Sequence, residues 1–255
     1  MERKLILVTN DDGIAAPGIR SLVEVARELA DVIVVAPDSP QSGKGHAVTL
    51  STPLRLHKVE VFKDVEAYEC TGTPVDCVKI AMDIVLKDRR PDLCISGINH
   101  GSNASINILY SGTVSAAMEA SVEGTTAIGF SLLDYSFDAN FEPSKPYVRS
   151  LIEDALNGKF GKGSLLNVNI PNLPAEEIKG IKFCRQSDAR WEEEFVEAID
   201  PRGQKYYWMT GKFVNRDKHN GTDIDALEAG YVSVVPSMYD LTDYGMLDKL
   251  NNGKD

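Results

Sequence analysis

The feature that most constrains the fold is an apolar run near the N-terminus that two acids follow almost at once. Residues 5–8 (LILV) are continuously apolar, which is typical of a strand buried on both faces of a parallel sheet. Asp11 and Asp12 come at its end, and Gly13 permits a tight turn directly afterwards. Open α/β sheets bind ligands beyond the carboxyl ends of their strands. The acids therefore indicate a site, although a plain turn with a helix cap explains the same residues.

The next segment completes a strand–helix–strand unit. Pro17 suits the first position of a helix, and apolar residues recur after it at helical spacing. A second apolar run at residues 32–36 (VIVVA) then ends at Pro37. This order predicts a right-handed βαβ crossover and a parallel sheet.

The remaining pattern continues the alternation of strands and helices. Thr73 is a predicted N-cap with an acid three residues later, and Gly124 is expected to end a helix that begins after residue 113. The segment 134–145 is polar and aperiodic, so we expect a surface loop. We expect strands at 47–51, 54–61, 65–70, 93–95, 126–132, 165–170, 178–184, 195–199, 205–211 and 231–235, and helices at 74–88, 114–123, 146–156 and 222–230. The fold class is thus α/β with a doubly wound, mostly parallel sheet.

Three further segments can reach the edge of the sheet where the acids lie. The second strand leads into a small-residue loop that contains Ser42, and the third into a loop with Asn99. Ser111–Thr113 opens a helix, whose free N–H groups and dipole favour an anion such as phosphate. Each segment taken singly also fits a surface loop or an ordinary N-cap. Because loops after parallel strands emerge on one edge, we expect all three beside Asp11 and Asp12.

This set of side chains suggests a metal-dependent phosphatase. Two carboxylates, a hydroxyl and an amide oxygen are hard ligands that suit Mg²⁺ or Mn²⁺. Two negative charges would balance a divalent cation and leave coordination positions for water and a phosphate oxygen.

Composition narrows the partners. The chain has 255 residues and a net charge of −11, which argues against a nucleic-acid polymer as partner. We expect no membrane span and no signal peptide, because no apolar run is long enough for either. The four cysteines show no C-x-x-C pair, so we expect buried thiols and a cytoplasmic location.

An ordered set of motifs resembles the SurE survival-protein family. The motifs are VTNDDG, VVAPDSPQSG, TGTPVDCV, ISGINHGSN, YSGTVSAAMEA, DPRGQKYYW and GTDIDALEAGYVSVVP, and together they extend from about Leu5 to Pro236. The resemblance implies a Rossmann-like core and hydrolysis of nucleoside monophosphates with one divalent metal ion per subunit. It also implies a homodimer or homotetramer formed through an exchanged C-terminal region. We accordingly expect a core at 1–177 and a hairpin with a swapped tail at 178–255.

The same resemblance assigns roles to individual residues. Asp11, Asp12 and Asn99 are the expected catalytic residues. The expected metal ligands are Asp11, Asp12, Ser42 and Asn99. The expected phosphate contacts are Gly43, Asn99, Asn103, Ser111, Gly112 and Thr113.

Other classes fit the pattern less well. A receiver-type domain is about half this length, a haloacid-dehalogenase-type phosphatase has Asp-x-Asp, and a dinucleotide-binding oxidoreductase requires G-x-G-x-x-G after its first strand. A nucleotide-binding regulator without turnover stays open as the alternative. His46 and His100 lie in the two site loops, where either can act as an acid or as a bystander. Base preference, 5′ against 3′ selectivity, polyphosphate activity and a water or Asp nucleophile also stay open.

The C-terminal part carries an aromatic group that predicts an interface. Phe195, Tyr206, Tyr207 and Trp208 are too apolar to favour contact with water. Stacking on a nucleobase is another use for the last three. We expect this ribbon to hold a dimer, or a dimer of dimers, together and to shape the pocket wall from the partner side. The competing model is a hairpin folded back on its own subunit.

Overall fold

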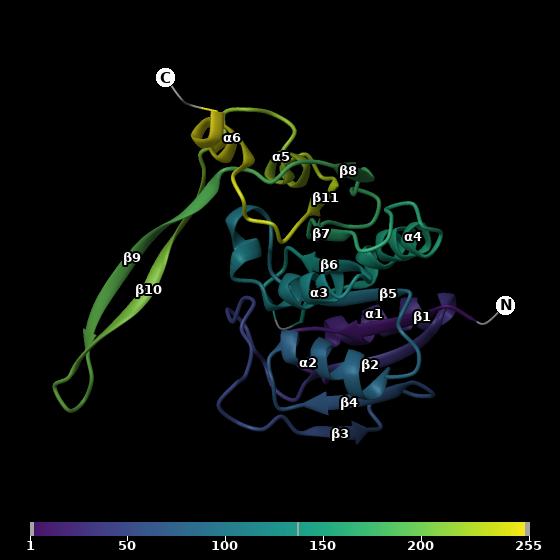
Figure 1. Ribbon diagram of the computed structural model, residues 1–255. Helices are drawn as coiled ribbons and strands as arrows, with labels where there is room; N and C mark the ends of the chain where they lie inside the picture. Colours follow the sequence, from purple (N-terminus) through teal and green to yellow (C-terminus); the bar gives the residue numbers. More distant parts are fainter. Residues whose placement is uncertain (1–2, 137, 253–255) are drawn as a thin grey trace.

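The computed structural model describes residues 3–136 and 138–252, and its centre is a nine-stranded sheet between two layers of helices (Figure 1). The strand order is β3-β4-β2-β1-β5-β6-β7-β11-β8, and β9 and β10 form a separate two-stranded sheet. Strands β4, β2, β1, β5, β6 and β7 are parallel, while β3 and β11 are each antiparallel to their neighbours β4 and β7. This is the expected doubly wound, mostly parallel α/β architecture.

The strands and helices have the following bounds. The strands are β1 Leu5–Thr9, β2 Asp31–Pro37, β3 Leu56–Val59, β4 Glu66–Cys70, β5 Leu93–His100, β6 Thr126–Leu132, β7 Leu165–Ile170, β8 Ile181–Phe183, β9 Ala189–Ile199, β10 Lys205–Asn215 and β11 Val232–Ser237. The α-helices are α1 Pro17–Leu29, α2 Pro74–Ile80, α3 Gly112–Val122, α4 Lys145–Leu156, α5 Asp223–Glu228 and α6 Tyr244–Asn252. A π-helix η1 (Ala81–Val85) and two 3₁₀ helices, η2 (Ser105–Leu109) and η3 (Glu142–Ser144), complete the structure.

Strand β1 shows why the core has two sides. Its side chains alternate between the faces of the sheet, as the strand period requires. Ile6 and Val8 lie in a core cluster with residues of α1 and α4, whereas Leu5 and Leu7 lie in a second cluster with residues of α2 and α3. Apolar residues at each of the positions 5–8 of β1 are therefore needed to bury both faces.

Several expected elements differ from those observed. Residues 47–51 form no strand, and the backbone N–H of Thr49 instead donates to the Asp76 carboxylate at 3.1 Å. The helix that Thr73 caps ends at Ile80 and continues only as η1, well before Asp88. The expected loop at 134–145 contains η3. Strand β5 extends to His100, because after a register shift between Ser96 and Asn99 the chain pairs with β6 again.

The C-terminal part contributes to two separate sheets. Strand β8 is an edge strand of the main sheet and β11 lies between it and β7, so residues on both sides of the expected boundary at residues 177 and 178 belong to this sheet. Strands β9 and β10 are longer than predicted and form a hairpin that extends away from the main sheet (Figure 1). Helix α6 has no buried residue.

Composition led to expectations about the cysteines and about membrane-spanning segments. Cys70, Cys77 and Cys94 are buried, Cys184 is partly buried, and all four are unpaired thiols. Within residues 3–136 and 138–252, no helix combines the length and the apolar character needed to cross a bilayer.

Candidate functional site

The site lies at the topological switch point of the sheet, where the strand order changes direction on the two sides of β1. Strand β1 pairs with β2 on one side and with β5 on the other, so the connections that leave these strands diverge and open a crevice. A cavity of about 740 Å³ occupies this region. The residues expected from the sequence that line it are Asp11, Ser42, Gly43, Asn99, Asn103 and Ser111.

Asp11 is the most deeply placed charged group of the cavity. Its side chain is buried, and its Oδ1 accepts a hydrogen bond from the hydroxyl of Thr113. Burial raises the pKa of Asp11 to about 6, and the charge of Asp12 adds to this effect. The hydrogen bonds from Thr113 act in the opposite direction. A cationic ligand would oppose both effects, because its charge would favour the ionised form of each carboxyl group.

Asp12 lies next to this site without lining the cavity itself. Its Oδ2 accepts the backbone N–H of His100 at 3.3 Å, so the ends of β1 and β5 are held together. Burial raises the pKa of Asp12, and His100 lowers it. The two acids expected to act together are therefore both in low-dielectric surroundings and repel each other.

The start of α3 packs directly against Asp11. Ser111 caps the helix, its Oγ accepting the backbone N–H of Val114 at 3.0 Å. A Cβ added to Gly112 would lie 2.8 Å from the Cβ of Asp11, so only glycine fits at this contact. Thr113 is fully buried, and its hydroxyl is directed at Asp11. Gly112 and Thr113, both expected at the phosphate, thus contact Asp11 and do not line the cavity.

Asn99 presents its amide oxygen to a ligand. The amide nitrogen donates to the backbone oxygens of His100 and Gly101 at 3.1 and 2.9 Å. These bonds fix the orientation of the side chain, so Oδ1 is the atom that Asn99 can offer a cation. The ring of His100 also lines the cavity and packs 5.1 Å from the ring of Phe141.

Asn103 is held by polar residues of β7 that sequence reasoning missed. Its backbone N–H donates to Oδ1 of Asn169 at 2.8 Å, and the amide of Asn167 donates to its backbone oxygen at 2.8 Å. Its own amide donates to Ser131 at 2.8 Å. Two asparagines at alternate positions of the otherwise apolar strand LLNVNI are the sequence signal for this support.

The loop after β2 brings Ser42 and Gly43 to the cavity. Gly43 has φ +73°, a conformation that favours glycine. A little further on, Nε2 of His46 lies 2.7 Å from Oε2 of Glu119 on α3. His46 is thereby part of an ion-pair group and does not line the cavity, in contrast to His100.

Another part of the lining is rich in aromatic and apolar side chains and comes partly from the hairpin of the same chain. Trp191, Met209, Thr210 and Gly211 line it, together with Tyr110 and Tyr135. The indole N–H of Trp191 donates to Oδ1 of Asn107 at 2.8 Å, so the hairpin base touches the loop that follows β5. In this structure the chain's own β9 and β10 contribute to the wall of the cavity, and the contribution expected from a partner subunit stays a prediction.

The distal hairpin aromatics lie elsewhere. Phe195, Tyr206, Tyr207 and Trp208 are exposed and do not line the cavity, which removes base stacking within this cavity as their use. Tyr206 and Trp208 pack edge to face with ring centroids 6.2 Å apart. They remain available for contact with another surface.

The donor set fits a hard divalent cation better than a soft one. In the described part of the chain, no group of three or more His, Cys, Asp or Glu side chains is arranged to hold a metal. The expected ligands Asp11, Asp12, Ser42 and Asn99 instead combine two carboxylates with neutral oxygens. Oxygen-only ligands with two charges match the preference of Mg²⁺ and Mn²⁺.

The chain matches known proteins over nearly its whole length. Residues 6–193 match the family model described as Survival protein SurE. A protein of Christiangramia forsetii named 5'-nucleotidase SurE is 59% identical over 254 residues, which cover 98% of this chain and 97% of the relative. A protein of the same name from Cytophaga hutchinsonii is 56% identical, with coverage of 98% and 97%.

A solved structure gives the same result for the fold. The crystal structure of the SurE protein from Aquifex aeolicus superimposes with a TM-score of 0.83 at 40% identity and covers 98% of this chain and 100% of that one. The resemblance seen in the motifs is therefore confirmed over nearly the whole length. The chain belongs to the SurE family.

Proposed function

We propose that the protein is a 5′-nucleotidase that releases phosphate from nucleoside 5′-monophosphates with the help of one divalent metal ion per subunit. The observation that carries this proposal is the mixed lining of the cavity: Asp11, Asn99 and Ser111 line it together with aromatic and apolar side chains. A nucleoside monophosphate likewise combines an anionic part with a largely apolar part. Family membership and the names of the relatives support the same reaction.

Asp11, Asp12, Ser42 and Asn99 would hold the metal ion. The support is the chemistry of these donors and the unfavourable proximity of a buried and a partly buried carboxylate, which a cation relieves. Bound there, Mg²⁺ or Mn²⁺ would supply Lewis-acid polarisation of the phosphate oxygens.

The residues of the chain have separable tasks in this proposal. Asp11 and Asp12 provide the negative charge of the site, and Asn99 is held with its oxygen available by its two hydrogen bonds. Gly43, Asn103 and Ser111 line the cavity, where they would bind the phosphate group. The α3 dipole would favour the charge that develops on the phosphate oxygens. Gly112 and Thr113 would act through Asp11.

His100 is the better placed of the two histidines considered as acids. It lines the cavity beside Asn99, whereas His46 is paired with Glu119. Hydrolysis of 3′-monophosphates and of short polyphosphate belongs to the same proposal, because both present a terminal phosphate to the same residues. A cytoplasmic location agrees with the four free thiols.

The hairpin and α6 would form the homo-oligomer. Phe195, Tyr207 and Trp208 on the hairpin and Leu250 on α6 are large, apolar and exposed. A surface of this kind is typical of a protein interface, and a second copy of the chain is the partner that the family resemblance implies. The exposed strands can pack on a neighbouring copy without any change to the main sheet.

A phosphate-release assay tests the activity. The purified protein is incubated with adenosine 5′-monophosphate in Mn²⁺, in Mg²⁺ and in EDTA. We expect release with either cation and loss of release in EDTA. Nucleotide binding without release under all conditions would instead favour the non-catalytic regulator.

A further inference from the structure

A buried carboxyl group outside the proposed site joins three separate parts of the chain. Asp223, the first residue of α5, is completely buried. Its Oδ2 accepts the backbone N–H of Ser105 at 2.7 Å, and its Oδ1 accepts those of Ser187 and Ile224 at 3.0 and 2.9 Å. Its own helix contributes one of these donors, and the other two come from distant segments.

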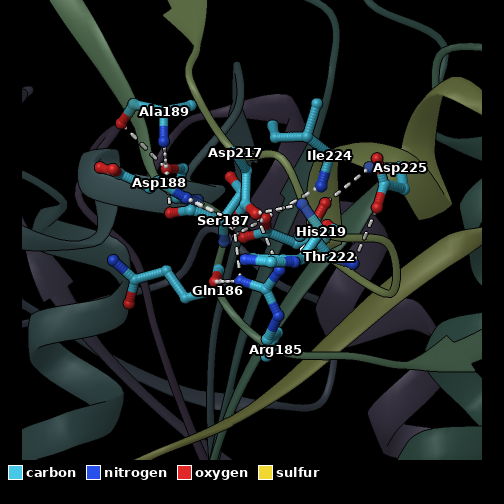
Figure 2. A network of polar contacts seen from close by, with 12 residues as sticks. Arg185, Gln186, Ser187, Asp188, Ala189, Asp217, His219, Thr222, Ile224 and Asp225 are labelled. Atoms are coloured by element: carbon cyan, nitrogen blue, oxygen red, sulfur yellow. Dashed lines mark hydrogen bonds and ion pairs between the residues drawn. The ribbon is translucent and has the colours of Figure 1, made fainter.

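Ser105 strengthens the same junction. Its backbone is left-handed, with φ 55°, which directs its N–H towards Asp223. Its hydroxyl oxygen lies 2.8 Å and 3.0 Å from the backbone oxygens of Ser187 and Ala189, and it accepts the N–H of Ala189 at 3.0 Å. Figure 2 shows Ser187 and Ala189 among the residues of this polar network, together with Thr222 and Ile224.

The junction connects two segments that line the cavity. Ser105 begins η2, two residues after Asn103, and Ala189 begins β9, two residues before Trp191. Asn103 and Trp191 both line the cavity. We call Asp223, Ser105, Ser187 and Ala189 the hairpin clamp.

A second polar contact closes the hairpin base from outside. Arg185 forms a two-pronged ion pair with Asp217, at 2.7 and 2.9 Å, across the two chain segments that lead into and out of the hairpin (Figure 2). This pair connects the hairpin ends to each other. The hairpin clamp connects the hairpin to the loop that follows β5, next to the hydrogen bond between Trp191 and Asn107.

We propose that Asp223 is a positioning residue that fixes the hairpin wall against the loop of Asn99 and Asn103 and so sets the affinity of the cavity for the nucleoside part of its substrate. The proposal rests on the proposed nucleotidase function. Asp223 does not line the cavity and touches no expected metal or phosphate ligand. Its effect should therefore appear in the KM for nucleotides and only weakly in the turnover of a small phosphate ester.

The chemistry of the clamp suggests the variant. Both oxygens of Asp223 accept backbone N–H groups, so an amide in its place must turn its NH₂ towards at least one of these donors. Asp223→Asn thus keeps the shape and breaks one arm. Asp225→Asn is the matched control, because Asp225 lies on the same helix and accepts N–H groups of the turn just before it, among them that of Thr222 at 3.1 Å in a capping box.

The test can follow the hairpin directly. The chain has two tryptophans, Trp191 and Trp208, and both are in the hairpin. In a Trp208→Phe background, quenching by acrylamide then reports on Trp191 alone. Hydrogen exchange at the amides of Ser105 and Ser187 reports on the clamp bonds.

We expect Asp223→Asn to speed exchange at these amides about tenfold and to increase the quenching of Trp191. The KM for adenosine 5′-monophosphate should rise about tenfold, while kcat for p-nitrophenyl phosphate changes less than twofold. Asp225→Asn should leave all four measurements within twofold. An unchanged KM with accelerated exchange, or an equal loss with both substrates, would overturn the proposal.

The test also allows for an Asp223→Asn protein that does not fold and for an unmodified protein without activity. If the Asp223→Asn protein does not fold, Ser105→Gly replaces it, because glycine keeps the left-handed backbone and removes the hydroxyl; an unchanged nucleotide KM in that variant overturns the proposal. If the unmodified protein hydrolyses neither substrate, the nucleotidase function fails, and exchange and quenching alone decide whether the clamp exists.

Discussion

The end of β1 and the start of α5 each bury an aspartate, and the two differ in what surrounds the carboxyl group. Asp223 accepts three backbone N–H groups, so both of its oxygens are used by the chain itself. Asp11 accepts the Thr113 hydroxyl, has a second carboxylate beside it and lines a cavity, and its pKa is raised to about 6. A buried carboxyl group that the chain satisfies stabilises the fold. One that burial and a like charge disfavour indicates a place for a ligand.

The largest expected effect tests the first half of this comparison. Asp11→Asn removes one of the two charges that would balance the metal, so phosphate release should fall at least about 100-fold. The metal-free protein should not lose stability. The raised pKa means that the folded state favours the neutral form of Asp11. The contribution of Asp11 to stability is therefore lost as the pH rises through about 6. The amide of asparagine carries no charge and avoids this loss.

Thermal unfolding in EDTA at pH 8 measures this second effect. We expect the Asp11→Asn protein to unfold at the same or a higher temperature than the unmodified protein, with a gain of up to about 2 kcal/mol. Full phosphatase activity in a folded variant at low Mn²⁺ would remove Asp11 from the site.

Asp223→Asn should have the opposite effect on stability. Turning an amide NH₂ towards a buried backbone N–H leaves both groups without an acceptor, which costs about 1 to 3 kcal/mol in the free energy of unfolding. Urea unfolding in EDTA measures this loss for comparison with Asp11→Asn. A variant as stable as the unmodified protein would show that the three hydrogen bonds contribute nothing net.

The comparison also marks what the sequence could predict. Local patterns predicted the core of the fold. Apolar runs identified β1, β2, β6 and β7. The residues that cap three of the helices, Thr73, Ser111 and Thr222, are of the types that favour this position. The rule that loops gather at one edge of the sheet was sufficient to predict that Asp11, Ser42 and Asn99 lie close together, and all three line the cavity.

The parts that were missed depend on contacts between distant residues. Trp191 reaches the cavity through Asn107, 84 positions away, and Ser105 is joined to Asp223 across 118 positions. The periodicity of apolar residues in a sequence does not indicate which distant residues are in contact. The segment 47–51 alternates like a strand but has no neighbour to pair with, and the helix after Thr73 loses its regular hydrogen bonding at Ala81, where η1 begins.

A third buried carboxylate separates the effect of burial from that of charge. Glu119 is buried like Asp11, and burial raises its pKa, but the hydrogen bonds from Lys79 and His46 outweigh this and lower it overall. Its contribution to stability is therefore present above its ordinary pKa of 4.5 and is lost as the pH falls through the lower value of the folded state.

Glu119→Gln tests that sign. The variant should lose about 1 kcal/mol of unfolding free energy at pH 7, since Lys79 is half exposed and solvent screens the pair. The difference from the unmodified protein should shrink as the pH is lowered below 4.5. A difference that grows in acid would mean that Glu119 behaves like Asp11 and that its cationic partners have little effect.

The smallest expected effect concerns Thr113, where the sequence and the structure suggest different roles. The motif resemblance places this residue among the phosphate contacts, whereas its hydroxyl is buried against Asp11. Thr113→Val keeps the shape and removes the donor that favours the ionised form of Asp11. We therefore expect Mn²⁺ to bind about fivefold more weakly, with little change in the nucleotide KM at saturating metal.

Calorimetric titration of the nucleotide-free protein measures the affinity for Mn²⁺, and Thr113→Ser, which keeps a hydroxyl, should restore this affinity. A raised nucleotide KM with unchanged Mn²⁺ affinity would return Thr113 to the phosphate and make Asp11 less dependent on the start of α3 than its contacts indicate.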